Sequence, residues 1–183
     1  MIACIGWGSL IWNTGSLDVD GHWHADGPPL PVEFARQSDN GLITLVVGEG
    51  FAPVTTLWSA FNTRDLAEAR ESLRQRERIL PSRASRFIAH WRRGENASSE
   101  PAATISRWAG GKEFEATVWT NLPPKFNGNN GRVPTEDEVV AYLRTLEGQT
   151  RAAAEEYVRR APRQITTAYR RAIETALGWT PID

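Results

Sequence analysis

The stretch that decides the fold is "IACIGWGSLIWN" at residues 2–13, an apolar run that is interrupted by Gly6, Gly8 and Ser9. A short apolar run that ends at a glycine is typical of a buried β-strand. Glycines within a strand mark a bulge or a place where another group approaches the backbone closely. Two interpretations are therefore open: a plain bulge at the corner of a barrel, or exposed backbone amides that meet a carboxylate or a developing oxyanion.

Outward from this stretch, the first two thirds of the chain contain further strand patterns, separated by turn-forming residues. They are "LITLVVG" from Leu42, "VTTLWSAF" from Val54, "RFIAHWRR" from Arg86, "ATISRWAG" from Ala103 and "FEATVWTN" from Phe114. The last three alternate apolar with polar residues, as half-exposed antiparallel strands do. With the first stretch they make six predicted strands with short connections, a pattern that favours a curved sheet or a small barrel.

The last third of the chain is predicted to be helical. Thr135 and Glu138 have the spacing of a capping box, Gly148 is a candidate C-cap, and Pro162 separates the last two helices. The predicted fold class is therefore α+β: a small curved mixed sheet or β-barrel flanked by helices, with a helical C-terminal part. At 183 residues the chain fits a single domain that spans residues 1–183.

One more helix is predicted among the strands, over "RDLAEARESLRQRER" at residues 64–78, with N-cap oxygens from Asn62 or Thr63. At about 100° per residue, one stripe of this helix faces the core. Its members are Leu66, Ala69, Leu73, Glu77 and Leu80. Glu77 is thus a carboxylate on the buried face, where desolvation raises a carboxyl pKa toward the range of a general base. The alternative is that Glu77 frays at the helix end or pairs with an arginine such as Arg74 or Arg36.

Composition excludes several classes of function. Lys plus Arg number 21 and Asp plus Glu 22, so the chain lacks the basic excess that nucleic-acid binding needs. No apolar segment reaches the roughly 18 to 20 residues of a membrane span, and no signal peptide is apparent. The single cysteine, Cys4, cannot form an internal disulfide, and a reducing cytoplasm fits it. We therefore expect a cytoplasmic protein with neither a nucleic-acid nor a membrane partner.

Other polar motifs carry weaker signals. The Gly-x-Gly-Ser at residues 6–9 lacks the third glycine of a dinucleotide site and the lysine of a P-loop. Ser9 lacks the G-x-S-x-G context of a nucleophile, although His90 remains a candidate base. His22 and His24 alone make a poor zinc site, so no metal is expected. The eight tryptophans are scattered, which favours core positions over an aromatic binding surface.

A resemblance joins the first stretch to Glu77. "IGWGSLIWN" resembles the signature of the γ-glutamylcyclotransferase superfamily and is especially similar to its ChaC branch. "VEFARQS", "GLITLVV" and "TTLWSAF" resemble the elements that follow, and "LRQRERI" places Glu77 at the family's catalytic glutamate. The match runs in order across residues 1–80. Trp7 stands where the family has a tyrosine, and "RILPSRA" replaces the family's glycines and tyrosine after the Arg-Glu pair.

The resemblance implies a small barrel flanked by helices that works without metal or cofactor on a small γ-glutamyl substrate. Glu77 would take a proton from the substrate α-ammonium, and the freed amine would attack the γ-carbonyl. 5-Oxoproline forms, and the leaving amine is reprotonated by Glu77. The residues that the resemblance assigns to the substrate are Gly6, Trp7, Gly8, Ser9, Leu10 and Ile11, with Gln37 and Ser38, which could equally close a turn.

The first prediction is thus a γ-glutamylcyclotransferase-like enzyme, an acyl transferase or lyase of the kind found in glutathione metabolism. Proximity of the held amine and carbonyl would supply on the order of 7 to 11 kcal/mol of the barrier. The alternative, prompted by Trp7, is a catalytically inactive protein that binds a γ-glutamyl compound or another small ligand on the same fold. A third class, an aromatic-rich interaction module, is supported by the tryptophan count alone.

Overall fold

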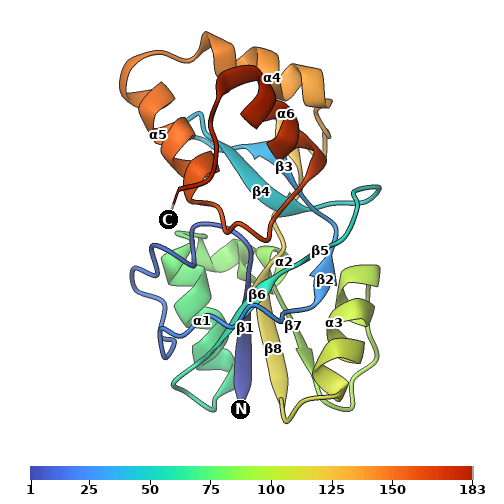
Figure 1. Cartoon of the computed structure of the whole chain (residues 1–183). Helices are drawn as coiled ribbons and strands as arrows, with labels where there is room; N and C mark the ends of the chain where they lie inside the picture. Colours follow the sequence, from blue (N-terminus) through green and yellow to red (C-terminus); the bar gives the residue numbers. More distant parts are fainter. Residues whose placement is uncertain (183) are drawn as a thin grey trace. The chain divides into compact units, whose positions relative to one another are not determined.

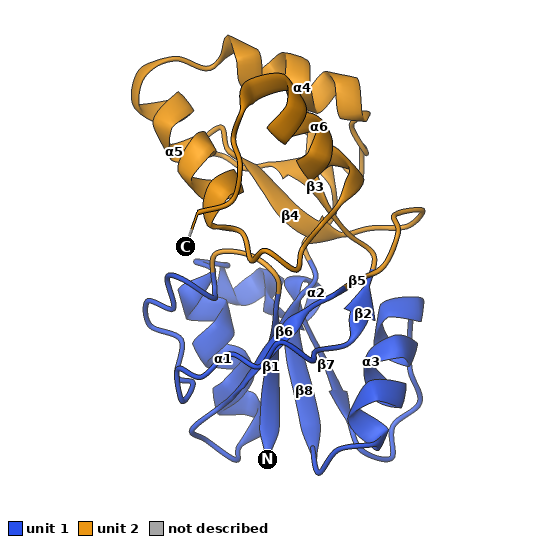
Figure 2. Ribbon diagram, viewed as in Figure 1, with its two compact units in different colours: residues 1–6, 10–30, 55–121 blue, residues 7–9, 31–54, 122–183 orange. Residues whose placement is uncertain are grey.

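The computed structural model describes residues 1–182, whose contacts group into two compact units (Figure 1 and Figure 2). Unit 1 comprises residues 1–6, 10–30 and 55–121, and unit 2 comprises residues 7–9, 31–54 and 122–183. The chain passes between the units several times, so neither is a continuous segment. The single domain expected from the sequence stays a prediction.

Unit 1 is built on a four-stranded mixed sheet in the order β6-β1-β8-β7. Its strands are β1 (Ile2–Gly6), β6 (Leu57–Ala60), β7 (Ile88–Arg92) and β8 (Ala116–Thr120). β1 pairs antiparallel with β6 and parallel with β8, and β7 pairs antiparallel with β8. Ala3, Cys4 and Ile5 of the central β1 are fully buried. β1 therefore forms the core strand that the apolar run predicts.

Helices cover this sheet. They are α1 (Leu66–Arg76), the 3₁₀ turn η1 (Pro81–Arg83), α2 (Ala84–Phe87) and α3 (Glu100–Gly110). α1 and α3 both pack against β7 and β8, and Figure 1 shows them on opposite sides of the sheet. The predicted strand at Ala103 is wrong, because this stretch lies in α3. Ser99 caps α3, and Ala102, Ile105 and Ala109 form its buried stripe.

Unit 2 contains a second four-stranded sheet, in the order β10-β9-β3-β4, and three helices. Its elements are β3 (Val32–Gln37), β4 (Ile43–Val47), β9 (Lys125–Phe126), β10 (Asn129–Asn130), α4 (Glu136–Thr145), α5 (Gly148–Arg160) and α6 (Ala168–Leu177). α6 packs against β3 and α4, and α5 packs against β4. Two further short strands of the chain, β2 (Pro29–Leu30) and β5 (Val54–Thr55), pair with each other.

The predicted α+β class and the mixed sheet are confirmed, but the barrel is wrong. Within residues 1–182 the strands divide among three sheets, and none of these closes on itself. In unit 1, β6 and β7 are the two edges and are not paired with each other. Four strands are too few to curve into a closed ring whose interior side chains can fill, so the sheet stays open and helices cover its faces.

The helical prediction for the last third is largely confirmed. Thr135 and Glu138 form the capping box at the start of α4. α5 ends at Arg160, two residues before Pro162. Gly148 is not a C-cap: α4 is capped by Leu146, and Gly148 is the first residue of α5.

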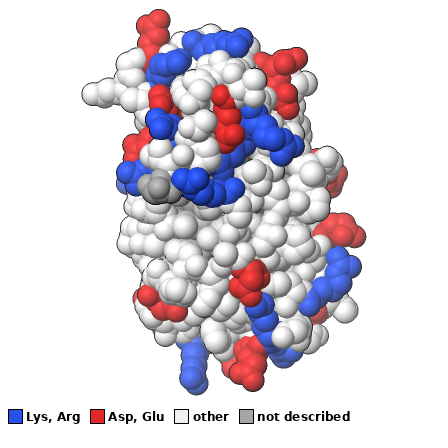
Figure 3. Space-filling view, viewed as in Figure 1, with Lys and Arg blue, Asp and Glu red and all other residues white. Residues whose placement is uncertain are grey.

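The face in Figure 3 carries both acidic and basic side chains and no large area of a single sign, in keeping with the near-neutral charge of the chain. Five of the eight tryptophans are buried. Among the described residues, no helix combines the length and the apolar character that crossing a membrane requires.

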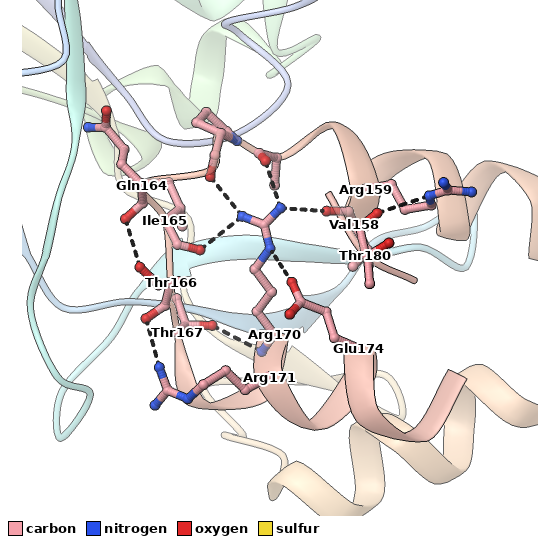
Figure 4. A network of polar contacts seen from close by, with 12 residues as sticks. Val158, Arg159, Gln164, Ile165, Thr166, Thr167, Arg170, Arg171, Glu174 and Thr180 are labelled. Carbon is pink, nitrogen blue, oxygen red and sulfur yellow. Dashed lines mark hydrogen bonds and ion pairs between the residues drawn. The ribbon is translucent and has the colours of Figure 1, made fainter. Parts of the chain in front are cut away.

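Arg170 is the largest fully buried side chain, and it ties the end of α5 to the start of α6 (Figure 4). Its guanidinium donates to four backbone carbonyls, those of Val158, Ala161, Pro162 and Ile165, at 2.7–3.5 Å. Its Nε donates to Glu174 at 3.1 Å. Helix C-terminal carbonyls have no partner within their own helix, and Val158 O in the last turn of α5 is one of them. The other three carbonyls lie in the segment 161–165 that links α5 to α6, so this one arginine holds the link in place.

Glu33 is a second buried charge of unit 2, on strand β3 at the start of α6. Its carboxylate accepts from the hydroxyl of Thr167 and from the amides of Phe34 at 2.9 Å and Tyr169 at 3.2 Å. Burial raises the pKa of Glu33, and these hydrogen bonds offset part of that shift. Glu33 thus serves the free amides of the α6 N-terminus from a neighbouring strand.

The raised pKa of Glu33 predicts a pH dependence of stability. Between the ordinary pKa of glutamate and the higher folded-state pKa, the native state binds more protons than the unfolded state, so the free energy of unfolding falls as pH rises. The free energy of unfolding of the wild type minus that of Glu33→Gln should therefore fall as pH rises through this window. Urea unfolding of both proteins across this pH range measures it. A difference that grows with pH would contradict the assignment.

Candidate functional site

The structure distributes the predicted site residues over the two units. Unit 1 holds Gly6, Leu10, Ile11 and Glu77, and unit 2 holds Trp7, Gly8, Ser9, Gln37 and Ser38. Each group has its own surroundings within its unit.

Glu77 is the C-cap of α1, which begins at Leu66. The N-cap is Asp65, not Asn62 or Thr63, and its carboxylate accepts from the amides of Ala67 and Glu68. Asp65 can reach these amides because its backbone is extended and it directly precedes the first helical residue.

A Schellman motif closes α1 behind Glu77. The Arg78 N–H donates to Gln75 O at 3.0 Å, and the Ile79 N–H donates to Arg74 O at 3.1 Å. Arg78 has a φ of 54°, in the left-handed region where glycine is usual. This reversal also takes Leu80 off the predicted stripe: Ala69 and Leu73 are buried, but Leu80 is 60% exposed.

Replacing Arg78 with glycine is expected to raise the free energy of unfolding by about 0.5 to 1 kcal/mol. Glycine removes the steric cost of the left-handed conformation, and its greater freedom in the unfolded chain offsets part of the gain. Urea unfolding measures the change. Arg83→Gly is the control, because Arg83 has a φ of −109° and should lose stability. Equal losses in both variants would contradict the expectation.

The Glu77 carboxylate lies in a partly buried ion pair. Its Oε1 is 2.7 Å from Arg76 Nη1, and the Glu77 side chain is 17% exposed. Burial raises the pKa of Glu77, and the adjacent Arg76 lowers it by a smaller amount. Glu77 therefore lies at the helix end and pairs with an arginine, as the alternative from the sequence has it, but that arginine is Arg76. Arg74 pairs instead with Glu71, and Arg36 donates to Pro123 O.

Within unit 1, the end of α1 interacts with Cys4 and Asn13, the residues that lie before and after "GWGSLIW" in the sequence. The Glu77 charge helps to raise the pKa of the buried Cys4 thiol on β1, where burial is the larger cause. On the other side, Arg76 Nη2 donates to Asn13 O at 2.6 Å. The strand that leads into the motif and the loop that leaves it are thus both neighbours of the Arg76–Glu77 pair.

Gly6 is explained by a close approach within unit 1. A Cβ at Gly6 would lie 2.7 Å from a ring carbon of Trp23, so any larger residue would displace that indole. The group that approaches the backbone at Gly6 is thus the Trp23 indole. Leu10 is buried and Ile11 is half-buried, as in a packed segment.

Trp7 and Gly8 pack on β4 and α5 in unit 2. Trp7 is buried, and its Nε1 donates to Leu45 O at 3.3 Å. A Cβ at Gly8 would lie 2.7 Å from the Tyr157 hydroxyl oxygen, which itself accepts from the Leu45 N–H at 3.3 Å. Ser9 is half-buried. Tyr157 therefore places a phenolic hydroxyl beside the motif backbone, and the sequence alone gave no signal for it.

The side chains of Gln37 and Ser38 are hydrogen-bonded to turns, in line with the alternative that they close a turn. Ser38 closes the turn between β3 and β4, because its hydroxyl accepts from the Leu42 N–H at 3.0 Å and donates to Asn40 at 2.6 Å. Gln37 Oε1 accepts from the Asn127 N–H at 2.9 Å, between β9 and β10. Both side chains are hydrogen-bonded to turns of unit 2.

His22 and His24 are part of an aromatic cluster. The rings of His22 and His24 lie 4.5 Å apart, and His24 stacks on Trp58 at 4.0 Å. Among residues 1–182, no three histidine, cysteine or carboxylate side chains come together in a way that could hold a metal ion.

Comparisons with known proteins leave the family open. No protein-family model matches the chain, and neither curated proteins nor solved structures show a significant similarity to it.

Proposed function

We propose that this chain is a γ-glutamylcyclotransferase-like enzyme that cyclises a γ-glutamyl amine or peptide to 5-oxoproline. The observation that carries the proposal is the surroundings of Glu77: a partly buried carboxylate with a raised pKa, in the same unit as β1, the strand that leads into "GWGSLIW". A carboxyl whose pKa lies closer to neutrality is a better general base and acid than an exposed glutamate.

The proposed reaction uses one group for two proton transfers. Glu77 takes a proton from the substrate α-ammonium, and the neutral nitrogen attacks the γ-carbonyl carbon and forms the ring C–N bond. The ring nitrogen of the tetrahedral intermediate releases its second excess proton to solvent, the intermediate collapses, the bond to the leaving amine breaks, and Glu77 returns the first proton to that amine. Arg76 orients the carboxylate and stabilises its ionised form before the first transfer.

In this proposal the backbone of residues 6–11 holds the γ-glutamyl moiety, as the resemblance implies. Gln37 and Ser38 support the neighbouring turns and do not contact the substrate in this proposal, because both side chains are already hydrogen-bonded to those turns. We also propose a cytoplasmic location, which the buried free thiol of Cys4 supports.

A screen for product formation tests the proposal. The purified chain is incubated with glutathione, γ-glutamyl amino acids and γ-glutamyl alkylamines, and 5-oxoproline is quantified by mass spectrometry. We expect catalytic release from at least one class, above the spontaneous rate measured without protein. Release that does not exceed this rate for any compound would contradict an enzymatic function.

The second candidate is a γ-glutamyl or other small-ligand binding protein without turnover. It is favoured by Trp7, whose indole N–H is bound to Leu45 O and which carries no phenolic hydroxyl for a substrate. Equilibrium binding of a γ-glutamyl compound without 5-oxoproline release would support this candidate over the enzyme.

A further inference from the structure

A pocket of about 620 Å³ lies in unit 1 at the start of α1. Its charged lining consists of Arg64, Asp65, Arg70, Arg92, Arg93 and Glu115. Ile2, the first residue of β1, also lines it. Glu77 lies at the other end of α1, which has 11 residues and is therefore about 16 Å long. The pocket is thus separate from the Glu77 site and independent of the proposed function.

Arg70 is the decisive residue of this pocket. Its Nε is buried without a hydrogen-bond partner, and its Nη2 has only a long contact of 3.4 Å with Ile88 O. The uncompensated charge reaches His90, whose pKa is lowered by burial and then by Arg70. A buried guanidinium N–H without an acceptor is costly, because it loses its water and gains nothing in return.

The acidic residues of the pocket do not neutralise its arginines. Asp65 is occupied as the N-cap of α1, where it accepts from two backbone amides. Arg93 donates to the carbonyls of Phe114, Ala109 and Lys112, which hold the guanidinium in place and leave its charge uncancelled. Glu115 is exposed. Four arginines against two carboxylates leave an excess of positive charge.

Two of the arginines have room to move toward a ligand, since Arg64 and Arg92 are exposed. Guanidinium groups bind phosphate and carboxylate oxygens through paired N–H donors. A volume of about 620 Å³ lies in the range of pockets for small molecules. We propose that this pocket binds a small multivalent oxyanion, of the phosphate or the polycarboxylate type.

Calorimetric titration of the full chain with inorganic pyrophosphate and, separately, with citrate tests the proposal. We expect saturable one-site binding of at least one of them at low ionic strength. The double variant Arg64→Gln/Arg92→Gln should weaken it by at least about tenfold, because each arginine contributes charge-assisted hydrogen bonds. The control Arg83→Gln/Arg107→Gln removes the same charge from exposed positions of unit 1 outside the pocket and should change the affinity less than about twofold.

A direct readout comes from Arg70 itself. Its Nε–H resonance, assigned by its loss in Arg70→Lys, should shift on addition of the bound anion, because the negative charge changes the electrostatic surroundings of the guanidinium. Binding of pyrophosphate alone would assign a phosphate-type ligand, and binding of citrate alone a carboxylate-type ligand. Absence of saturable binding by either anion, equal weakening in both double variants, or an Arg70 signal unmoved at saturation would overturn the proposal.

Discussion

Replacing Glu77 with glutamine is expected to lower kcat/KM for 5-oxoproline release by about a hundredfold to ten-thousandfold. The amide has nearly the same shape but can neither accept the α-ammonium proton nor return one to the leaving amine. Because the general base also acts in the transition state, the loss should fall on kcat more than on KM. Rates measured on the best substrate of the panel test this.

The matched control is Glu71→Gln on the same helix, an exposed carboxylate that pairs with Arg74. It should leave the rate unchanged. The raised pKa of Glu77 further predicts that kcat/KM falls, on the acid side, at a pH above the ordinary pKa of glutamate. If the wild type is active and Glu77→Gln releases 5-oxoproline at an undiminished rate, the proposed mechanism is contradicted.

Replacing Arg170 with methionine is expected to lower the free energy of unfolding by about 3 to 5 kcal/mol. Methionine keeps much of the volume, but the four carbonyls around the end of α5 lose their shared donor, and three of them belong to the buried residues Val158, Ala161 and Ile165. Glu174 also loses the positive charge that it pairs with. Denaturant unfolding followed by tyrosine and tryptophan fluorescence measures the loss.

Arg171→Met is the control for Arg170. Arg171 is the next residue on α6, is exposed, and makes one hydrogen bond of 3.2 Å to Thr166 O. We expect a change within about 0.5 kcal/mol for an exposed position of this kind. If Arg170→Met does not fold, Arg170→Lys takes its place and should be less stable than Arg171→Met, since an ammonium cannot reach every carbonyl. Similar stabilities of both methionine variants would show that α5 does not depend on Arg170.

Sequence patterns predicted the elements whose local signals agree. β1 is apolar and ends in glycine, and the capping box of Thr135 and Glu138 lies where α4 begins. The strand prediction for the α3 stretch was wrong because "ATISRWAG" fits both the helical and the strand period. Ile105 and Ala109 are four residues apart, as on a helix face, yet polar and apolar residues also alternate. The cap at Ser99 and the proline at Pro101 were the available signals for a helix.

For the candidate site, the sequence could predict only residues whose polarity conflicts with the pattern of their own helix or strand. Glu77 was found because it lies on an apolar stripe, and the same test applied to α6 would have found Arg170, three residues before the buried Ile173. The partners of Glu77 could not be found in this way. Cys4 and Asn13 approach α1 through tertiary packing across more than 60 positions of sequence, and no local pattern encodes that distance.

The position of β1 has a consequence for synthesis on the ribosome. β1 is made before the strands it pairs with: its antiparallel partner β6 begins at residue 57 and its parallel partner β8 at residue 116. Until about residue 120 has left the exit tunnel, one edge of "IACIG" has no neighbour and offers an apolar template to other nascent chains. Slow codons before β8 would therefore lower the yield of native protein more than slow codons after it. A chaperone that covers β1 during this time would raise the yield.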